Sequence, residues 1–187
     1  DGPSVFFLGR PSRSGKPNGT LKLGILTQGQ EPAFDLPFAD VTIDGVRYRL
    51  AVGEADHADA VALRTRLSFL APQPVGVRKS VGLGDRMGLA TPGHVRALRR
   101  IEGIFPILAQ QSIREMERSA RTPAEVMDGA TWGVFQEGWR GGYGADADHQ
   151  KNEADIDSCL AQGFITYTID PRDHVDNAAD SDSPATL

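Results

Sequence analysis

The segment from Gly144 to Lys151, GADADHQK, places two carboxylates, an imidazole and an ammonium group within eight residues. Asp146 and Asp148 are two residues apart, so on a strand their side chains would lie on the same face. Two carboxylates on one face of a buried strand are unfavourable unless they are paired or bind a metal. His149 adds a neutral imidazole, which is a common metal ligand. The pattern favours a functional site over the simpler alternative, an exposed turn that precedes a helix.

Polar side chains also follow the other strand-like segments. Asp85 and Arg86 come after one such segment, Gln111 ends a second, and Asp170 ends another. The active sites of parallel α/β folds lie at the carboxyl ends of their strands. Polar residues at four consecutive strand ends therefore indicate an active-site face. Taken alone, Asp85 and Arg86 could instead form a turn with a surface ion pair.

Four strand candidates alternate with helical segments in the second part of the chain. They lie near residues 76–82, 105–110, 143–147 and 164–169. Thr91, Thr122 and Asn152 stand where three of the helices should begin, and each is a residue type that caps helices. Ser112 and Glu115 form a further capping pattern, so we expect Glu115 to cap a helix rather than to catalyse. The alternation of strands and helices predicts a parallel sheet.

Residues 1–74 show a different pattern. The run VTIDGVRYRLAV predicts a hairpin that turns at Asp44 and Gly45. Apolar residues at helical spacing then predict a helix between Asp56 and Leu70. We therefore expect a β-rich N-terminal region with a helix over residues 1–74, followed by four βα units over residues 75–187.

Four βα units are half of a (β/α)8 barrel, which typically needs about 250 residues. Two interpretations follow: a small open α/β sheet, or the first half of a TIM-type barrel whose chain is cut short. The chain begins at Asp1 rather than at a methionine, so we expect its natural N-terminus to be missing.

The composition argues against several classes of protein. The net charge of −5 is spread along the chain without a basic patch, so we expect no nucleic acid partner. No run of 18 apolar residues occurs, so we expect no membrane span. The single cysteine, Cys159, excludes an internal disulfide and is typical of a reducing compartment. We therefore expect a cytoplasmic protein.

Five long phrases resemble the tagaturonate epimerase family. They are SVGLGDRMGLATPGH, AQQSIRE, DGATWGVFQEGW, GADADHQK and TYTIDP. The resemblance implies a metal-dependent sugar-acid epimerase on a TIM barrel, which interconverts D-tagaturonate and D-fructuronate in hexuronate catabolism. It implies that Asp148 is the acid/base and His149 a ligand of a divalent metal. Family chains are more than twice as long, so the other ligands and a second acid/base would come from the part that is absent here.

The two sugar acids differ at a hydroxyl-bearing carbon that lies β to the ketone, where the carbonyl does not acidify the hydrogen. A retro-aldol route is therefore easier to justify than deprotonation at that carbon, although the sequence does not choose between them. A metal would act as a Lewis acid, and a carboxylate would act as general base. Asp85, Arg86, Gln111 and Lys151 are the expected substrate-binding residues, and the planar fork of Arg86 suits the substrate carboxylate better than Lys151 does.

Other functions remain compatible with these residues. A metal-dependent aldolase or another sugar isomerase could use the same barrel, and an aldolase would release two fragments. A non-catalytic sugar-acid-binding module would bind without a metal and without Asp148. An α/β domain with no site would leave the polar strand ends merely solvated. For half a barrel, we also expect residues 1–187 alone to be poorly stable and inactive, because an unpaired sheet edge remains.

Overall fold

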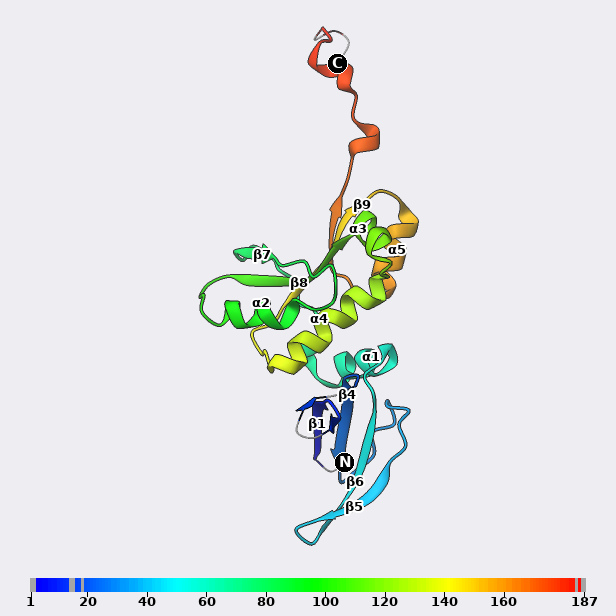
Figure 1. Ribbon diagram of the computed structural model, residues 1–187. Coiled ribbons are helices and arrows are strands. Elements are labelled where there is room, and N and C mark those ends of the chain that lie inside the picture. The colour runs from blue at the N-terminus through cyan, green and yellow to red at the C-terminus, as the bar shows by residue number, and fades with distance from the viewer. Residues whose placement is uncertain (1–2, 14–15, 18, 184, 186–187) are drawn as a thin grey trace.

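The computed structural model describes residues 3–13, 16–17, 19–183 and 185 (Figure 1). An antiparallel sheet lies at one end of the molecule, an α/β unit lies in the middle, and the C-terminal tail extends away from the α/β unit. No helix within these residues is long and apolar enough to cross a membrane.

The N-terminal part is a four-stranded antiparallel sheet followed by a helix. The sheet has the order β1-β4-β6-β5, with β1 (Ser4–Gly9), β4 (Lys22–Thr27), β5 (Ala39–Ile43) and β6 (Val46–Glu54). A separate ribbon pairs β2 (Ser12–Arg13) with β3 (Lys16–Pro17). The strands β5 and β6 form a hairpin across Asp44 and Gly45, where φ is 50° and 78°. Positive φ at both positions is what a two-residue hairpin turn requires.

The α/β unit is built on a four-stranded parallel sheet. Its strands follow the sequence order β7-β8-β9-β10, with β7 (Ser80–Gly82), β8 (Phe105–Ser112), β9 (Gly144–Gln150) and β10 (Thr166–Ile169). The predicted parallel direction and the neighbour order are confirmed. The first strand is shorter than the expected 76–82, and the third is longer than the expected 143–147. Nearly the whole GADADHQK segment is therefore strand.

One helix, α1 (His57–Arg66), precedes the parallel sheet in the chain. The helices that connect its strands are α2 (Thr91–Leu98), α3 (Ile113–Ser119), α4 (Pro123–Glu137) and α5 (Glu153–Ala161). Short 3-10 turns are η1 (Ser68–Leu70), η2 (Arg172–His174) and η3 (Asn177–Asp180). The capping boxes at Ser112 and Thr122 are both present, and Asn152 caps α5 as expected.

The predicted cap of α2 is wrong. Thr91 is the first helical residue rather than the N-cap, and Ala90, which precedes it, has no side chain that could cap. The carboxylate of Asp85 takes this role from the preceding loop, accepting hydrogen bonds from the amides of Leu89, Ala90 and Thr91 at 2.9, 2.7 and 2.8 Å. A sequence pattern predicts a capping residue directly before the helix, whereas Asp85 lies several residues before α2.

The two parts are packed together rather than joined by a free linker. Arg64 of α1 donates to Asp128 of α4 at 3.0 Å, and Nδ1 of His57 lies 2.7 Å from the same carboxylate. The hydroxyl of Tyr143 donates to the carbonyl of Leu70 at 2.6 Å. Buried apolar residues of both parts form one continuous cluster. The α/β unit with its half-barrel sheet therefore rests directly on the N-terminal region.

Candidate active site

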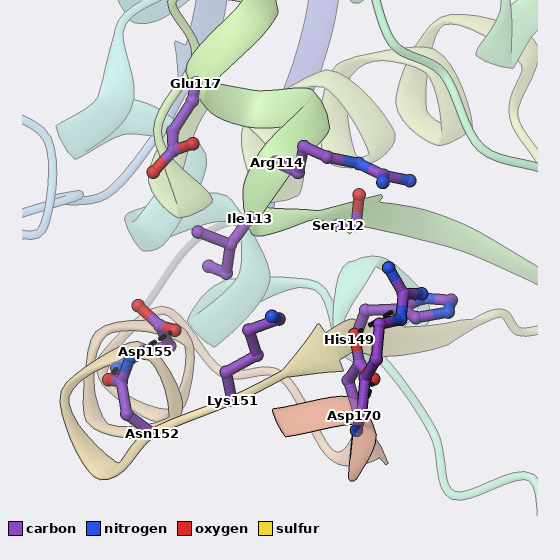
Figure 2. A pocket seen from close by; sticks show the side chains of 10 residues that line it. Ser112, Ile113, Arg114, Glu117, His149, Lys151, Asn152, Asp155 and Asp170 are labelled. Carbon is purple, nitrogen blue, oxygen red and sulfur yellow. Dashed lines mark hydrogen bonds and ion pairs between the residues drawn. The ribbon is translucent and has the colours of Figure 1, made fainter. Parts of the chain in front are cut away.

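The carboxyl ends of β8, β9 and β10 border a cleft of about 400 Å³ (Figure 2). Parallel strands bring their carboxyl ends to the same edge of the sheet, so side chains distant in sequence meet there. The residues that line the cleft include Ser112, Arg114, His149, Lys151, Asp170 and Arg172. Two of the predicted site residues, His149 and Lys151, are thus at this cleft.

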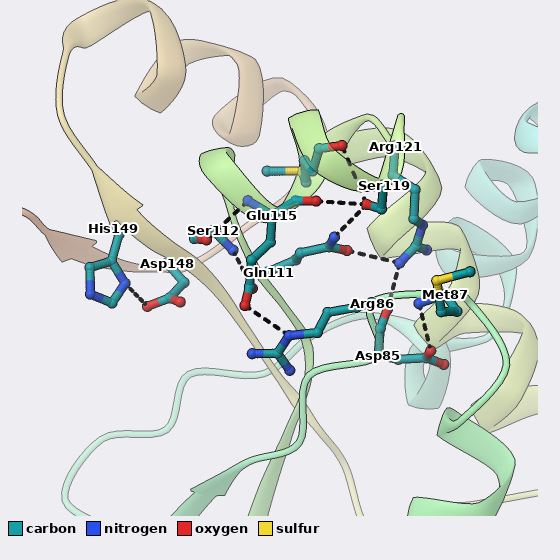
Figure 3. A network of polar contacts seen from close by, with 11 residues as sticks. Asp85, Arg86, Met87, Gln111, Ser112, Glu115, Ser119, Arg121, Asp148 and His149 are labelled. Carbon is teal, nitrogen blue, oxygen red and sulfur yellow. Dashed lines mark hydrogen bonds and ion pairs between the residues drawn. The ribbon is translucent and has the colours of Figure 1, made fainter.

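Asp148 and His149 form a hydrogen-bonded pair at the end of β9. Nδ1 of His149 lies 2.7 Å from Oδ1 of Asp148 (Figure 3). An ionised carboxylate only accepts hydrogen bonds, so the neutral tautomer that fits this contact carries its proton on Nδ1 and its lone pair on Nε2. The other Asp148 oxygen, Oδ2, has no hydrogen-bond partner among the residues that the structure describes.

The backbone explains how neighbouring side chains can meet. Successive residues on a regular strand point to opposite faces. His149 departs from that geometry, with a φ of 56° in the left-handed region, which a residue other than glycine adopts only at a cost. This conformation turns the imidazole back toward Asp148. The side chains of Asp148 and His149 are 20% and 52% exposed, so both remain accessible.

Asp146 is held more tightly than Asp148. Its carboxylate is buried and accepts hydrogen bonds from Nε2 of Gln110 at 3.0 Å and from the hydroxyl of Thr168 at 3.1 Å. Burial raises the pKa of Asp146, the two hydrogen bonds oppose that shift, and the nearby charge of Asp148 adds to it. The two carboxylates of the motif therefore have different surroundings, and Asp148 is the more accessible one.

Three of the predicted substrate-binding residues lie outside the cleft lining. Asp85 is buried, and its carboxylate is occupied by the α2 amides. Arg86 donates from Nε to Glu115 at 2.8 Å (Figure 3). The expected ion pair of Arg86 therefore exists, but its partner comes from α3 rather than from Asp85. These contacts give both residues a role in holding the loop between β7 and α2.

Gln111 points into the helix layer. Its side chain is 1% exposed, donates to the hydroxyl of Ser119 at 2.9 Å and accepts from Arg121 at 2.9 Å. Its neighbour Gln110 points to the other side of the sheet, where it meets Asp146. Successive strand residues alternate in direction, and the pairing of Gln110 with Asp146 sets which glutamine shares the face of the acidic motif.

Sequence reasoning missed Arg114, which lines the cleft from the first turn of α3. A usable signal was present, because Arg114 follows Ser112 by two residues and so falls in the first turn of a helix that starts at a strand end. Lys151 was predicted, and its Nζ donates to Asp173 at 2.9 Å. Asp170, at the end of β10, accepts from the Arg172 amide at 3.0 Å.

Comparison with known proteins identifies the family of this chain. The family model for tagaturonate epimerase matches residues 7–186. The chain belongs to the tagaturonate epimerase family. The tagaturonate/fructuronate epimerase of Thermotoga maritima is 53% identical over 124 residues, which are 66% of this chain and 26% of that protein.

Solved structures of the family agree with the fold. The fructuronate-tagaturonate epimerase from Cohnella laeviribosi, in a crystal structure with one glycerol, is 38% identical with a TM-score of 0.77, covering 91% of this chain and 34% of that one. Its native structure is 37% identical with a TM-score of 0.72, covering 88% and 33%. The chain thus spans about a third or less of the length of these epimerases.

The Asp148–His149 pair fits one side of a metal site. Nδ1 of His149 is held by a carboxylate, which is how metal-binding histidines are commonly oriented, and Nε2 remains available as a ligand. Within the described part of the chain, no three His, Cys, Asp or Glu side chains are grouped closely enough to hold an ion. A metal at His149 would need further ligands from elsewhere.

Proposed function

We propose that the protein containing this chain is a metal-dependent epimerase that interconverts D-tagaturonate and D-fructuronate. The observation that carries the proposal is the match of residues 7–186 to the tagaturonate epimerase family, with Asp148 and His149 hydrogen-bonded beside a cleft at the strand ends. A site at this edge of a parallel sheet is where enzymes of this architecture bind their substrates.

Asp148 is proposed as the general base. Its Oδ1 is occupied by His149, so Oδ2 is the atom free to take a proton from the substrate hydroxyl. In the retro-aldol route, loss of that proton turns the hydroxyl into an aldehyde while the adjacent carbon–carbon bond breaks and its electrons move onto the ketone side. Rotation of the aldehyde and re-addition, with the proton returned by Asp148, give the epimer. A positioned acid/base contributes about 10²–10⁴-fold in rate.

His149 is proposed as a metal ligand through Nε2, and Lys151 as a substrate contact on the cleft wall. A bound divalent cation would supply Lewis-acid stabilisation of the negative charge that develops on the ketone side. We assign Asp85, Arg86 and Gln111 to supporting the β7–α2 loop and α3, because their side chains are engaged there.

We further propose that additional βα units complete the half-barrel sheet to a TIM barrel, because the matched epimerases are about three to four times as long as the matched segment. We place the reaction in the cytoplasm, since Cys159 is a free buried thiol and such thiols are typical of reducing compartments.

The test uses the full-length purified protein with D-tagaturonate in deuterated water. Appearance of D-fructuronate supports epimerisation, and release of two fragments would indicate an aldolase instead. Retention of hydrogen at the epimerised carbon supports the retro-aldol route, whereas deuterium there would mean direct deprotonation. Loss of activity with a chelator and its return with a divalent metal would support metal dependence.

A further inference from the structure

The cleft beside His149 is lined by three cationic side chains, from Arg114, Lys151 and Arg172. Two of them already have anionic partners. Nζ of Lys151 donates to Asp173 at 2.9 Å, and Nη2 of Arg172 lies 3.7 Å from the carboxylate of Asp170. The positive charges of Lys151 and Arg172 are therefore each partly offset by a carboxylate of the chain.

Arg114 is different. Among the residues that the structure describes, its guanidinium has no hydrogen bond and no ion pair. The capping box between Ser112 and Glu115 fixes the turn from which the side chain projects. In Figure 2 the side chain extends toward Ser112 and His149, in the opposite direction from Glu117. A cation without a partner among the described residues therefore lines the same cleft as His149.

The predicted anion-binding residue, Arg86, is engaged elsewhere. Its Nε donates to Glu115, and it is not part of the cleft lining. Arg114 is one residue before that glutamate on α3. Arg86 is therefore paired with Glu115, while Arg114, the residue before Glu115, lines the cleft.

We infer that Arg114 binds the carboxylate of the sugar-acid substrate. The five N–H groups of a guanidinium form a planar fork that matches a carboxylate with two parallel hydrogen bonds. A sugar acid differs from a neutral sugar in this one anionic group, so an unpaired arginine in the cleft sets specificity for acids over neutral sugars. This inference rests on the proposed function, because it concerns how the same cleft holds its substrate.

The experiment compares Arg114→Met and Arg114→Lys with the matched control Arg118→Met in the full-length protein. Arg118 lies one helical turn further along α3, is exposed, and is not among the cleft-lining residues. Arg114→Met should raise KM for D-tagaturonate by about 10–100-fold, as expected when a hydrogen bond to a charged group is lost, and should change kcat much less. The KM of Arg114→Lys should lie between those of the wild type and Arg114→Met, since lysine keeps the charge but not the planar fork. Arg118→Met should match the wild type.

A second readout separates charge recognition from damage to the cleft. D-galacturonate and neutral D-galactose serve as probes, and calorimetry measures their binding to the protein. Arg114→Met should lose most of the D-galacturonate binding and keep whatever D-galactose binding the wild type shows. Equal weakening of both ligands, or an unchanged KM and an unchanged D-galacturonate affinity, would overturn the inference. If the wild type binds D-galacturonate through Arg114 yet does not epimerise D-tagaturonate, the proposed activity fails while the inference stands.

Discussion

Nδ1 of His149 lies 2.7 Å from Oδ1 of Asp148, although the two residues are adjacent on one strand. The left-handed backbone at His149 makes this contact possible. Among the residues that the structure describes, Oδ2 of Asp148 and Nε2 of His149 have no hydrogen-bond partner, so the proposed proton acceptor and the proposed metal ligand lie side by side at the strand end.

Replacing Asp148 with Asn should separate base catalysis from metal binding. The amide oxygen of Asp148→Asn can still accept the His149 hydrogen bond, but the amide cannot take up the substrate proton. Turnover should fall by about 10²–10⁴-fold, while the metal content measured by elemental analysis stays near that of the wild type.

Glu115→Gln is the control for that variant. A glutamine still closes the capping box, and loss of the exposed Arg86–Glu115 ion pair should cost less than about 1 kcal/mol. Activity should remain near the wild-type level. If Asp148→Asn kept full activity while Glu115→Gln lost it, the base would have to move from β9 to the end of β8.

His149→Gly and His149→Ala should differ in stability but not in metal binding. Both variants remove the imidazole, so both should lose metal. Glycine adopts positive φ without a steric cost, whereas alanine does not, so His149→Gly should be the more stable variant by about 1 kcal/mol. Denaturant unfolding measures the difference, and an equal or lower stability of the glycine variant would show that the left-handed conformation is not maintained in solution.

Asp85 should stabilise the fold in a pH-dependent way. Burial opposes ionisation of Asp85, but the hydrogen bonds from Thr91, Leu89 and Ala90 outweigh it and lower the pKa of the carboxyl group. A pKa that is lower in the folded state contributes stability that is complete above the unfolded value of about 3.9 and is lost as the pH falls through the folded value.

The variant Asp85→Asn tests this. At pH 7 it should lower the free energy of unfolding by about 1–3 kcal/mol, since the helix amides lose a charged acceptor. The difference in the free energy of unfolding between the wild type and Asp85→Asn should become smaller at pH 3 and below. A gap that does not depend on pH would mean that the charge of Asp85 does not contribute to stability.

Asp128→Ala should loosen the contact between α1 and α4. It would leave Arg64, whose side chain is 11% exposed, without its anionic partner, and breaking a buried ion pair typically costs about 3–5 kcal/mol. Hydrogen bonding of Arg64 to Thr131 at 2.9 Å should offset part of that loss. Thermal unfolding measures the effect, with Arg96→Gln as the control, because the Arg96 side chain is 63% exposed. A similar loss of thermal stability in both variants would contradict a special role for the buried Arg64–Asp128 ion pair.

The amino-acid sequence was sufficient to predict the alternation of strands and helices, the parallel sheet, and the Asp148–His149 motif. These features depend on local signals: β-branched runs, capping boxes at Ser112 and Thr122, and polar residues at strand ends. Local signals also predicted that the residues of the motif lie on one strand, where successive side chains point to alternate faces of the sheet.

Which polar residues share the cleft depends on how the folded segments pack together. Gln111 was predicted to contact substrate, but strand register turns it into the helix layer and gives Gln110 the contact with Asp146. Asp85 caps a helix that begins several residues later. Arg86 pairs with Glu115 of α3, and Arg114 lines the cleft without an ion pair among the residues that the structure describes. Partners of this kind are set by packing between segments far apart in the chain, which residue type and spacing along the sequence do not specify.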